Sequence, residues 1–408
     1  MRRIRIIFVL LAGLLLAGCN GLERPYEGTY EHVLIYGGLG FNNLSGDIVR
    51  NFEQIQEGIL PGLSRDKAIV AFCHTAVGSN YDVPNPPRLM RIYRGPDGAA
   101  HVDTLKTYSE MTVSASKESL RQVFEDIQRM FPARHYGMLI SSHGTGWIPG
   151  GYDSGSEAST LRERIVEPET PWPLTKALCN QFSGSGRNVR TRWLEFSDFV
   201  DAIPMKLDYM VIDACLMGTV EVVYELKDIC DYLVVSPTEV MEYGMIYKTL
   251  SWDMLAGSKA DLRTYCEEFY DYYNNHASAP YGTITLVDCS RVDALSDAFA
   301  AILDAHRDAL DIRLSGRVQR YYYGSSSLRF YYDLRDLCVQ LGASSAELER
   351  LDAALDACIP YHAETPYFFD LRLERCCGLS VYIPDPAKTK LNTFYSGLSW
   401  NRKVRLVD

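Results

Sequence analysis

The sequence predicts an α/β protein in which helices cover a mostly parallel central sheet. Short apolar runs rich in Val, Ile, Leu and Tyr alternate with segments of helical periodicity, and this alternation is typical of parallel sheets. Hydrophobic residues make up 47% of the chain, which is enough for a globular core. The expected strands are residues 32–36, 68–73, 136–142, 208–213, 232–236 and 282–287.

Helical spacing of apolar residues predicts helices over 48–59 and 120–131. From about residue 290 the pattern changes to longer helical segments, with an aromatic cluster around Tyr321–Tyr323 and a late strand at 379–383. The cluster is either a binding surface or, as we favour, a cover for an interface. We expect a main domain over 31–290 and a C-terminal region over 291–408 that completes the fold.

The N-terminus has the pattern of an export signal. Three arginines, at positions 2, 3 and 5, precede an apolar run at 6–16, which is too short to span a membrane. The run ends in Leu16-Ala17-Gly18-Cys19, which resembles the bacterial lipobox. This resemblance implies a signal peptide over 1–18, a lipid on Cys19 and a tether over 19–30. The expected location is the bacterial cell envelope, at the outer membrane or the periplasmic face; an ordinary signal peptide is the alternative.

Charge and cysteine spacing exclude several functions. The formal charge is −11, and without the three arginines of the signal it is −11 − 3 = −14, so phosphate-neutralising binding to nucleic acid is not expected. The eleven cysteines contain no CxxC pair, and the eight histidines contain no HExxH motif, so no metal site is predicted. The adjacent Cys376 and Cys377 stay unassigned. No Gly-x-Ser-x-Gly motif lies at a strand-to-helix turn.

Two of the expected strands end close to residues that are suited to nucleophilic catalysis. One strand delivers His143, followed at once by Gly144, and another delivers Cys215 at the start of an expected helix. Carboxyl ends of parallel strands meet at one edge of a sheet, so the two side chains should be close. An imidazole and a helix N-terminus both lower a thiol's pKa toward working pH. The N–H groups of Gly144 and Cys215 are candidates for an oxyanion hole.

Two motifs, SHGTGW at 142–147 and DACLMGTVEV at 213–222, follow the expected strands that end near His143 and Cys215. Through these motifs the chain resembles the clostripain family of cysteine peptidases, and the resemblance extends through 33–45, 231–240 and 378–384. It implies a caspase-like α/β/α sandwich and a cysteine endopeptidase with a dyad of His143 and Cys215, needing no third residue. It also implies cleavage of peptides and proteins after Arg or Lys, with Asp213 as the acidic residue near the nucleophile. Glu239 is a second candidate for substrate binding.

Two features leave this resemblance incomplete. Many relatives have DNNL after the first strand, whereas residues 40–44 here are GFNNL, so the role of that aspartate is in doubt. Some members need calcium, but no EF-hand-like D-x-D-x-D loop is present, so calcium stays open and no other cofactor is expected. A catalytically silent surface lipoprotein that serves as a binding module is the alternative function.

A long aperiodic stretch separates the two strands that carry His143 and Cys215. Residues 151–195 are rich in Gly, Ser and Pro and contain several basic residues. Such a loop fits self-cleavage by an enzyme that prefers Arg or Lys. Arg162 and Arg164 are the expected sites, because the basic cluster at 187–192 adjoins a helical pattern at 193–203 and is held more firmly.

Overall fold

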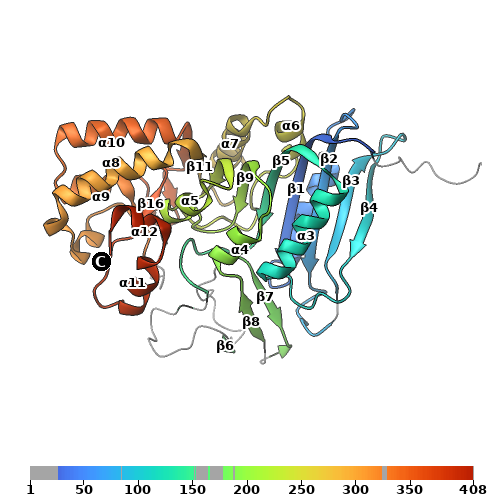
Figure 1. Ribbon diagram of the computed structural model, residues 1–408, viewed down its shortest axis with the longest axis horizontal. Helices are drawn as coiled ribbons and strands as arrows, with labels where there is room; N and C mark the ends of the chain where they lie inside the picture. Colours follow the sequence, from blue (N-terminus) through green and yellow to red (C-terminus); the bar gives the residue numbers. More distant parts are fainter. Residues whose placement is uncertain are drawn as a thin grey trace, which may run out of the picture.

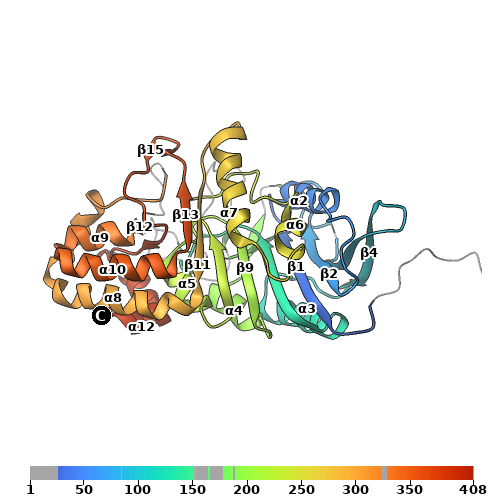
Figure 2. The same ribbon diagram turned by 90° about the horizontal axis from the view of Figure 1, so that it is seen from above.

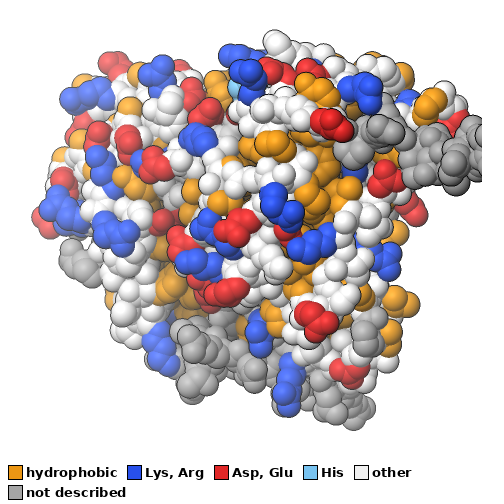
Figure 3. Space-filling view, turned by 45° about the vertical axis from the view of Figure 1, so that its right-hand side comes forward, with side chains coloured by type: hydrophobic (Ala, Val, Ile, Leu, Met, Phe, Trp, Pro, Cys, Tyr) orange, Lys and Arg blue, Asp and Glu red, His pale blue; other side chains and the backbone are white. Residues whose placement is uncertain are grey.

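The computed structural model describes residues 26–83, 85–150, 152, 178–186, 189–323 and 329–407, together with the backbone of residues 164–165. A large central sheet forms the middle of the molecule, and a helical C-terminal region lies at one end (Figure 1). Among the helices in these ranges, none has the length and apolar character needed to cross a bilayer. On the face drawn in Figure 3, Lys and Arg are interspersed with Asp and Glu, unlike the continuous basic stripe of a nucleic-acid-binding surface.

Within the described residues the central sheet has nine strands in the order β13-β11-β10-β9-β5-β1-β2-β3-β4. The five strands from β10 to β2 are parallel, whereas β3, β4, β11 and β13 join by antiparallel pairing. The strands are β1 (Tyr30–Gly40), β2 (Lys67–Thr75), β3 (Arg88–Arg94), β4 (Ala100–Thr107), β5 (Ala133–Ser141), β9 (Leu207–Asp213), β10 (Cys230–Val235), β11 (Thr283–Asp288) and β13 (Tyr361–Glu364).

Helices cover both faces of this sheet, so the predicted α/β/α sandwich is confirmed. Figure 2 shows α2 (Ser45–Glu57), α6 (Leu250–Leu255) and α7 (Leu262–Asp271) on one face. The other face carries α3 (Lys117–Met130), α4 (Phe196–Ala202) and α5 (Val220–Leu226). Alternate residues of β1 enter the two separate cores, as the two-residue period of a strand requires: Leu34 and Tyr36 lie in one, Val33 and Ile35 in the other.

The C-terminal region contributes both helices and a strand. It contains α8 (Val292–Ala305), α9 (Leu334–Leu341), α10 (Ser345–Cys358), α11 (Thr389–Ser396) and α12 (Ser399–Val404), and its β13 extends the central sheet beside β11. Tyr321 is fully buried and donates a hydrogen bond to Asp333 Oδ2 at 2.9 Å, so this part of the aromatic cluster packs inside the region. The late strand is shorter than expected: β16 spans only Ser380–Val381 and pairs with β12 (Tyr332–Asp333).

A small second sheet lies between β5 and α4 in the sequence. Its order is β6-β8-β7, with β6 at Arg164–Ile165, β7 at Asn180–Ser183 and β8 at Arg190–Trp193. The helical pattern expected at 193–203 therefore begins three residues late, because Trp193 ends a strand and α4 starts at Phe196. Residues 190–193 are held by antiparallel pairing along β7.

Candidate active site

The register between β5 and β9 brings the two predicted catalytic residues to one edge of the sheet. These strands are parallel neighbours, and Ser141 lies opposite Asp213. The pairing continues one step further, because the Ser142 N–H donates to the Asp213 carbonyl at 3.1 Å. His143 and Cys215 each follow two residues after this paired position, and both are partly exposed. The two side chains therefore leave adjacent strands at the same level of the carboxyl edge.

The loop after Cys215 is held in an unusual conformation. Leu216 has φ of 61°, in the left-handed region that few residues other than glycine adopt. Its N–H donates to the Thr238 carbonyl at 2.9 Å, and the Gly218 N–H donates to the Ser236 carbonyl at 2.7 Å. Backbone hydrogen bonds to the segment after β10 therefore fix the position of the nucleophile.

One sequence-based expectation about Cys215 is wrong. The thiol does not lie at the start of a helix, because α5 begins only at Val220, and its N-cap is Thr219, whose side chain accepts from the Val222 N–H. Residues 214–218 form a loop instead, which the left-handed Leu216 and the hydrogen bonds above impose. The Val222 N–H in the first turn of α5 is therefore capped by Thr219 rather than directed at the sulfur.

A backbone donor contacts the sulfur in place of a helix N-terminus. The Val240 N–H donates to Cys215 Sγ at 3.4 Å, and the thiol also lies 3.8 Å from the Val240 carbonyl. A hydrogen bond donated to sulfur stabilises the thiolate relative to the thiol. The segment before Val240 is anchored by buried hydroxyls, because Thr283 Oγ1 lies 2.8 Å from both Ser236 Oγ and Thr238 Oγ1. This donor is thus held at a fixed place.

Gly144 lies against the backbone of the nucleophile loop. A Cβ at this position would be 2.8 Å from the Cys215 carbonyl oxygen and 2.8 Å from Ala214 Cβ, so only glycine allows the loops to approach so closely. Within the described part of the chain, no acceptor takes the Gly144 N–H. This geometry leaves a backbone donor beside the nucleophile, as an oxyanion hole requires.

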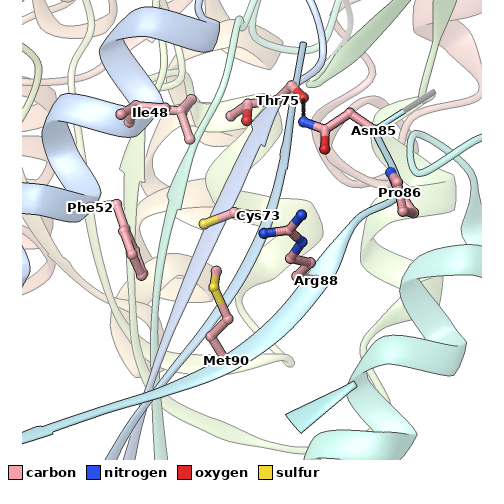
Figure 4. A pocket seen from close by; sticks show the side chains of 9 residues that line it. Ile48, Phe52, Cys73, Thr75, Asn85, Pro86, Arg88 and Met90 are labelled. Atoms are coloured by element: carbon pink, nitrogen blue, oxygen red, sulfur yellow. Dashed lines mark hydrogen bonds between the residues drawn. The ribbon is translucent and has the colours of Figure 1, made fainter. Parts of the chain in front are cut away.

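Two other cysteines near this edge have surroundings that disfavour a thiolate. Cys73, near the end of β2, points into a cavity of about 150 Å³ between α2 and β2–β3, where Phe52 and Met90 are among its neighbours (Figure 4). Burial raises the pKa of Cys73 to about 12, and burial has the same effect on Cys179. Both stay protonated at neutral pH, so Cys215 is the candidate nucleophile among the three.

Asp213 is a buried carboxyl with no cationic partner among the described residues. Its Oδ2 accepts hydrogen bonds from the Tyr247 hydroxyl and, at 3.1 Å, from the Ser141 hydroxyl. Burial raises the pKa of Asp213 despite these hydrogen bonds. Gly244, at φ of 79°, makes the close approach possible, because a Cβ there would lie 2.7 Å from Asp213 Oδ2.

Glu239 is a second acid beside the nucleophile, since it immediately precedes the Val240 that contacts Cys215. Burial raises the pKa of Glu239 to about 7. Its Oε2 is buried, and no partner for it is found in the described ranges. The structure thus brings His143, Gly144, Cys215, Asp213 and Glu239 to the same edge of the sheet.

Three other predicted residues lie wholly or partly outside the described residues. Cys19 and Arg162 lie outside the described residues, and only the backbone of Arg164 is described, in β6. No group of three or more His, Cys, Asp or Glu side chains that could hold a metal ion is found in the described ranges. Sequence reasoning also missed two contacts: the Val240 N–H, which no motif signals, and Asn43, which lies in the GFNNL segment but was not assigned a role.

Comparisons with known proteins concern the family and the fold. The family model of the clostripain family, peptidase family C11, matches residues 165–355. An inactive zymogen C11 protease from Parabacteroides distasonis is similar over 93% of this chain and 99% of its own, with 25% identity and a TM-score of 0.74. The chain is a cysteine peptidase similar to the clostripain family.

Two further solved structures share the fold of this cysteine peptidase. A secreted C11 cysteine protease from Bacteroides thetaiotaomicron, iotapain, is 23% identical and covers 92% of this chain and 99% of its own, with a TM-score of 0.73. A secreted C11 protease from the same organism, in complex with an irreversible peptide inhibitor, is 19% identical, covers 92% of this chain and 99% of its own, and has a TM-score of 0.71. No protein in a curated set of sequences matches the chain.

Proposed function

We propose that this peptidase is an endopeptidase that cleaves after Arg or Lys with Cys215 as nucleophile and His143 as acid and base. The observation that carries the dyad is the register of Ser141 opposite Asp213, from which both residues follow two positions later. The thiolate attacks the scissile carbonyl and forms a tetrahedral intermediate, whose oxyanion accepts from the N–H groups of Gly144 and Cys215. Imidazolium at His143 then protonates the leaving amine, and water hydrolyses the thioester.

The cationic specificity is supported by the uncompensated carboxyl of Asp213. A buried carboxylate without a cationic partner is costly, so a substrate that supplies the missing charge gains binding energy there. An Arg guanidinium forms a bidentate pair with a carboxylate, and a Lys ammonium supplies the same charge as a point donor. Glu239, whose Oε2 has no partner among the described residues, is a second acid that this proposal assigns to substrate binding.

Activation and location complete the proposal. The P. distasonis relative is described as an inactive zymogen, which supports regulation by cleavage here too. We assign the cut to the 151–195 stretch, at Arg162 or Arg164. Arg190 and Arg192 lie in β8, the central strand of the small sheet, which is paired on both sides, whereas Arg164 lies in its edge strand β6. The lipobox-like pattern at residues 16–19 supports anchoring of the exported protein through Cys19.

A covalent probe tests the dyad and the specificity together. A peptidyl chloromethyl ketone with Arg at P1 should alkylate Cys215, as located by mass spectrometry of the modified peptide, and a matched probe with Glu at P1 should not. His143→Ala should abolish labelling while leaving the melting temperature unchanged. Labelling of a different cysteine, or equal labelling by both probes, would contradict the proposal.

A further inference from the structure

A side-chain amide contacts the Nε2 nitrogen of the His143 imidazole. His143 Nε2 lies 2.8 Å from Asn43 Oδ1, within the range of a good hydrogen bond. The amide oxygen is an acceptor, so Nε2 carries the proton and donates it. Asn43 lies in the loop between β1 and α2, one hundred residues away in sequence, and thus reaches His143 only through the fold.

The position of Asn43 is set by its buried neighbour, Asn42. Asn42 Oδ1 accepts from the Leu44 N–H at 2.8 Å, which closes a tight turn around Asn43. Asn42 Nδ2 donates to the Asn180 carbonyl at 2.8 Å and to Asn180 Oδ1 at 2.7 Å. Asn42 is 1% exposed, whereas Asn43 itself is exposed. Packing therefore explains Asn42 but not Asn43, whose exposed side chain contacts the imidazole.

The segment around β7 forms backbone hydrogen bonds near both His143 and Asn43. The Cys179 N–H, just before β7, donates to the His143 carbonyl at 3.0 Å. The Phe182 N–H, inside β7, donates to the Phe41 carbonyl at 2.8 Å, two residues before Asn43. One short segment therefore fixes the backbone on both sides of the Asn43–His143 hydrogen bond. These backbone contacts therefore preorganise Asn43 for its hydrogen bond to His143.

We propose that Asn43 is a positioning residue of this peptidase that accepts the Nε2–H of His143 and thereby leaves Nδ1 as the nitrogen facing the Cys215 thiol. This inference rests on the proposed dyad. The amide fixes the tautomer and the ring orientation of the neutral imidazole. It also stabilises the imidazolium, because Nε2–H becomes a stronger donor when the ring is charged. The same division of roles is found in Cys-His-Asn sites on an unrelated fold.

Three substitutions separate positioning from a structural role. Asn43→Ala removes the acceptor, and we expect kcat to fall about 10- to 100-fold with KM nearly unchanged. The alkaline limb of the kcat/KM profile, where the imidazolium loses its proton, should move to lower pH. Asn43→Asp restores the acceptor with a negative charge, so most of kcat should return and the limb should move to higher pH. Asn180→Ala removes only the side-chain acceptor and keeps the backbone carbonyl that holds Asn42, so it should lower the melting temperature without moving the limb.

A second readout needs no hydrolysis. The pH dependence of Cys215 alkylation by iodoacetamide reports the thiolate–imidazolium pair, and it should shift in the same directions in Asn43→Ala and Asn43→Asp. Unchanged kcat and an unmoved limb in Asn43→Ala, or an unmoved limb and alkylation profile in Asn43→Asp, would overturn the assignment. Failure of the proposed dyad would be recognised separately, because a Cys215→Ala variant that retains Asn43 would then still hydrolyse the substrate.

Discussion

The backbone N–H of Val240 lies 3.4 Å from the sulfur of Cys215 and donates to it. The Cys215 thiol, which has no helix N-terminus beside it, thus receives a fixed backbone dipole from the segment after β10. Since a donated hydrogen bond favours the thiolate, removal of this N–H should raise the pKa of Cys215.

Val240→Pro deletes that donor, and Val240→Ala is the matched control that keeps it. We expect alkylation of Cys215 by iodoacetamide below neutral pH to be about tenfold slower in the proline variant, corresponding to about one pKa unit. Cys73 and Cys179 do not interfere at that pH, because burial raises the pKa of each to about 12. Equal rates in the two variants, with equal melting temperatures, would show that the N–H has no influence on the thiol.

Asp213→Asn should reduce kcat/KM for an Arg substrate by about tenfold or more, because a charge-assisted hydrogen bond contributes about 1.5–3 kcal/mol. The pH dependence has a definite sign. Burial raises the pKa of Asp213, so its carboxyl gains a proton as the pH falls through that value, and KM for the Arg substrate should rise there. The asparagine variant should lack this dependence. A substrate with Leu at P1 serves as control, and a wild-type enzyme that cleaves both substrates equally well would refute the assignment.

Glu239→Gln should change stability in a pH-dependent way. The pKa of Glu239 is raised to about 7 in the folded state, so folding favours the protonated acid. Stability is therefore greatest below the unfolded pKa and is lost as the pH rises to about 7. The glutamine variant avoids the loss, and its free energy of unfolding at pH 8 should exceed that of the wild type by up to about 3 kcal/mol. At pH 4 the two proteins should denature alike in urea. A gain of equal size at both pH values would exclude ionisation as the cause.

Cleavage in the 151–195 stretch should depend on the enzyme's own nucleophile. Wild type and Cys215→Ala are expressed side by side and compared on a denaturing gel. We expect two fragments from the wild type that elute together under native conditions, and one band from the mutant. A variant that keeps Cys215 but has Ala in place of both Arg162 and Arg164 should stay uncut. Fragments of the same size from Cys215→Ala would show that another protease makes the cut.

The lipid anchor is tested by Cys19→Ser, which removes the thiol that acylation requires. The variant should move from the membrane fraction to the soluble fraction of cells, while the parent chain stays with membranes after a salt wash. Persistence of the serine variant in the washed membranes would place the anchor elsewhere.

The buried parallel strands could be predicted because their sequences are continuous apolar runs. All six expected strands of the central sheet are present, and the ends that carry His143 and Cys215 lie where the pattern puts them. The strands β3 and β4 were missed for the opposite reason. Three arginines interrupt β3, and β4 is partly exposed along its length at the edge of the sheet, so neither shows an apolar run.

The details of the active site depend on contacts that no local pattern carries. The expected helix start at Cys215 failed because Leu216 takes a left-handed conformation, which hydrogen bonds from a distant segment impose. Asn43 was read only as a departure from a family motif, although its hydrogen bond to His143 spans one hundred residues. Spacing in a sequence identifies residues that end adjacent strands, but it does not identify which loops close over them.

The place of β5 and β9 in the sheet also determines how the catalytic strands respond to local opening. β5 is paired with β1 and β9, and β9 is paired with β5 and β10, so each has a hydrogen-bonded neighbour on both sides. Fraying at the outer strands β4 and β13 leaves these ladders intact. Backbone amides of β5 and β9 should then exchange with deuterium only through global unfolding, and those of β4 much sooner. Heat should accordingly abolish catalysis and the protection of these two strands in a single step.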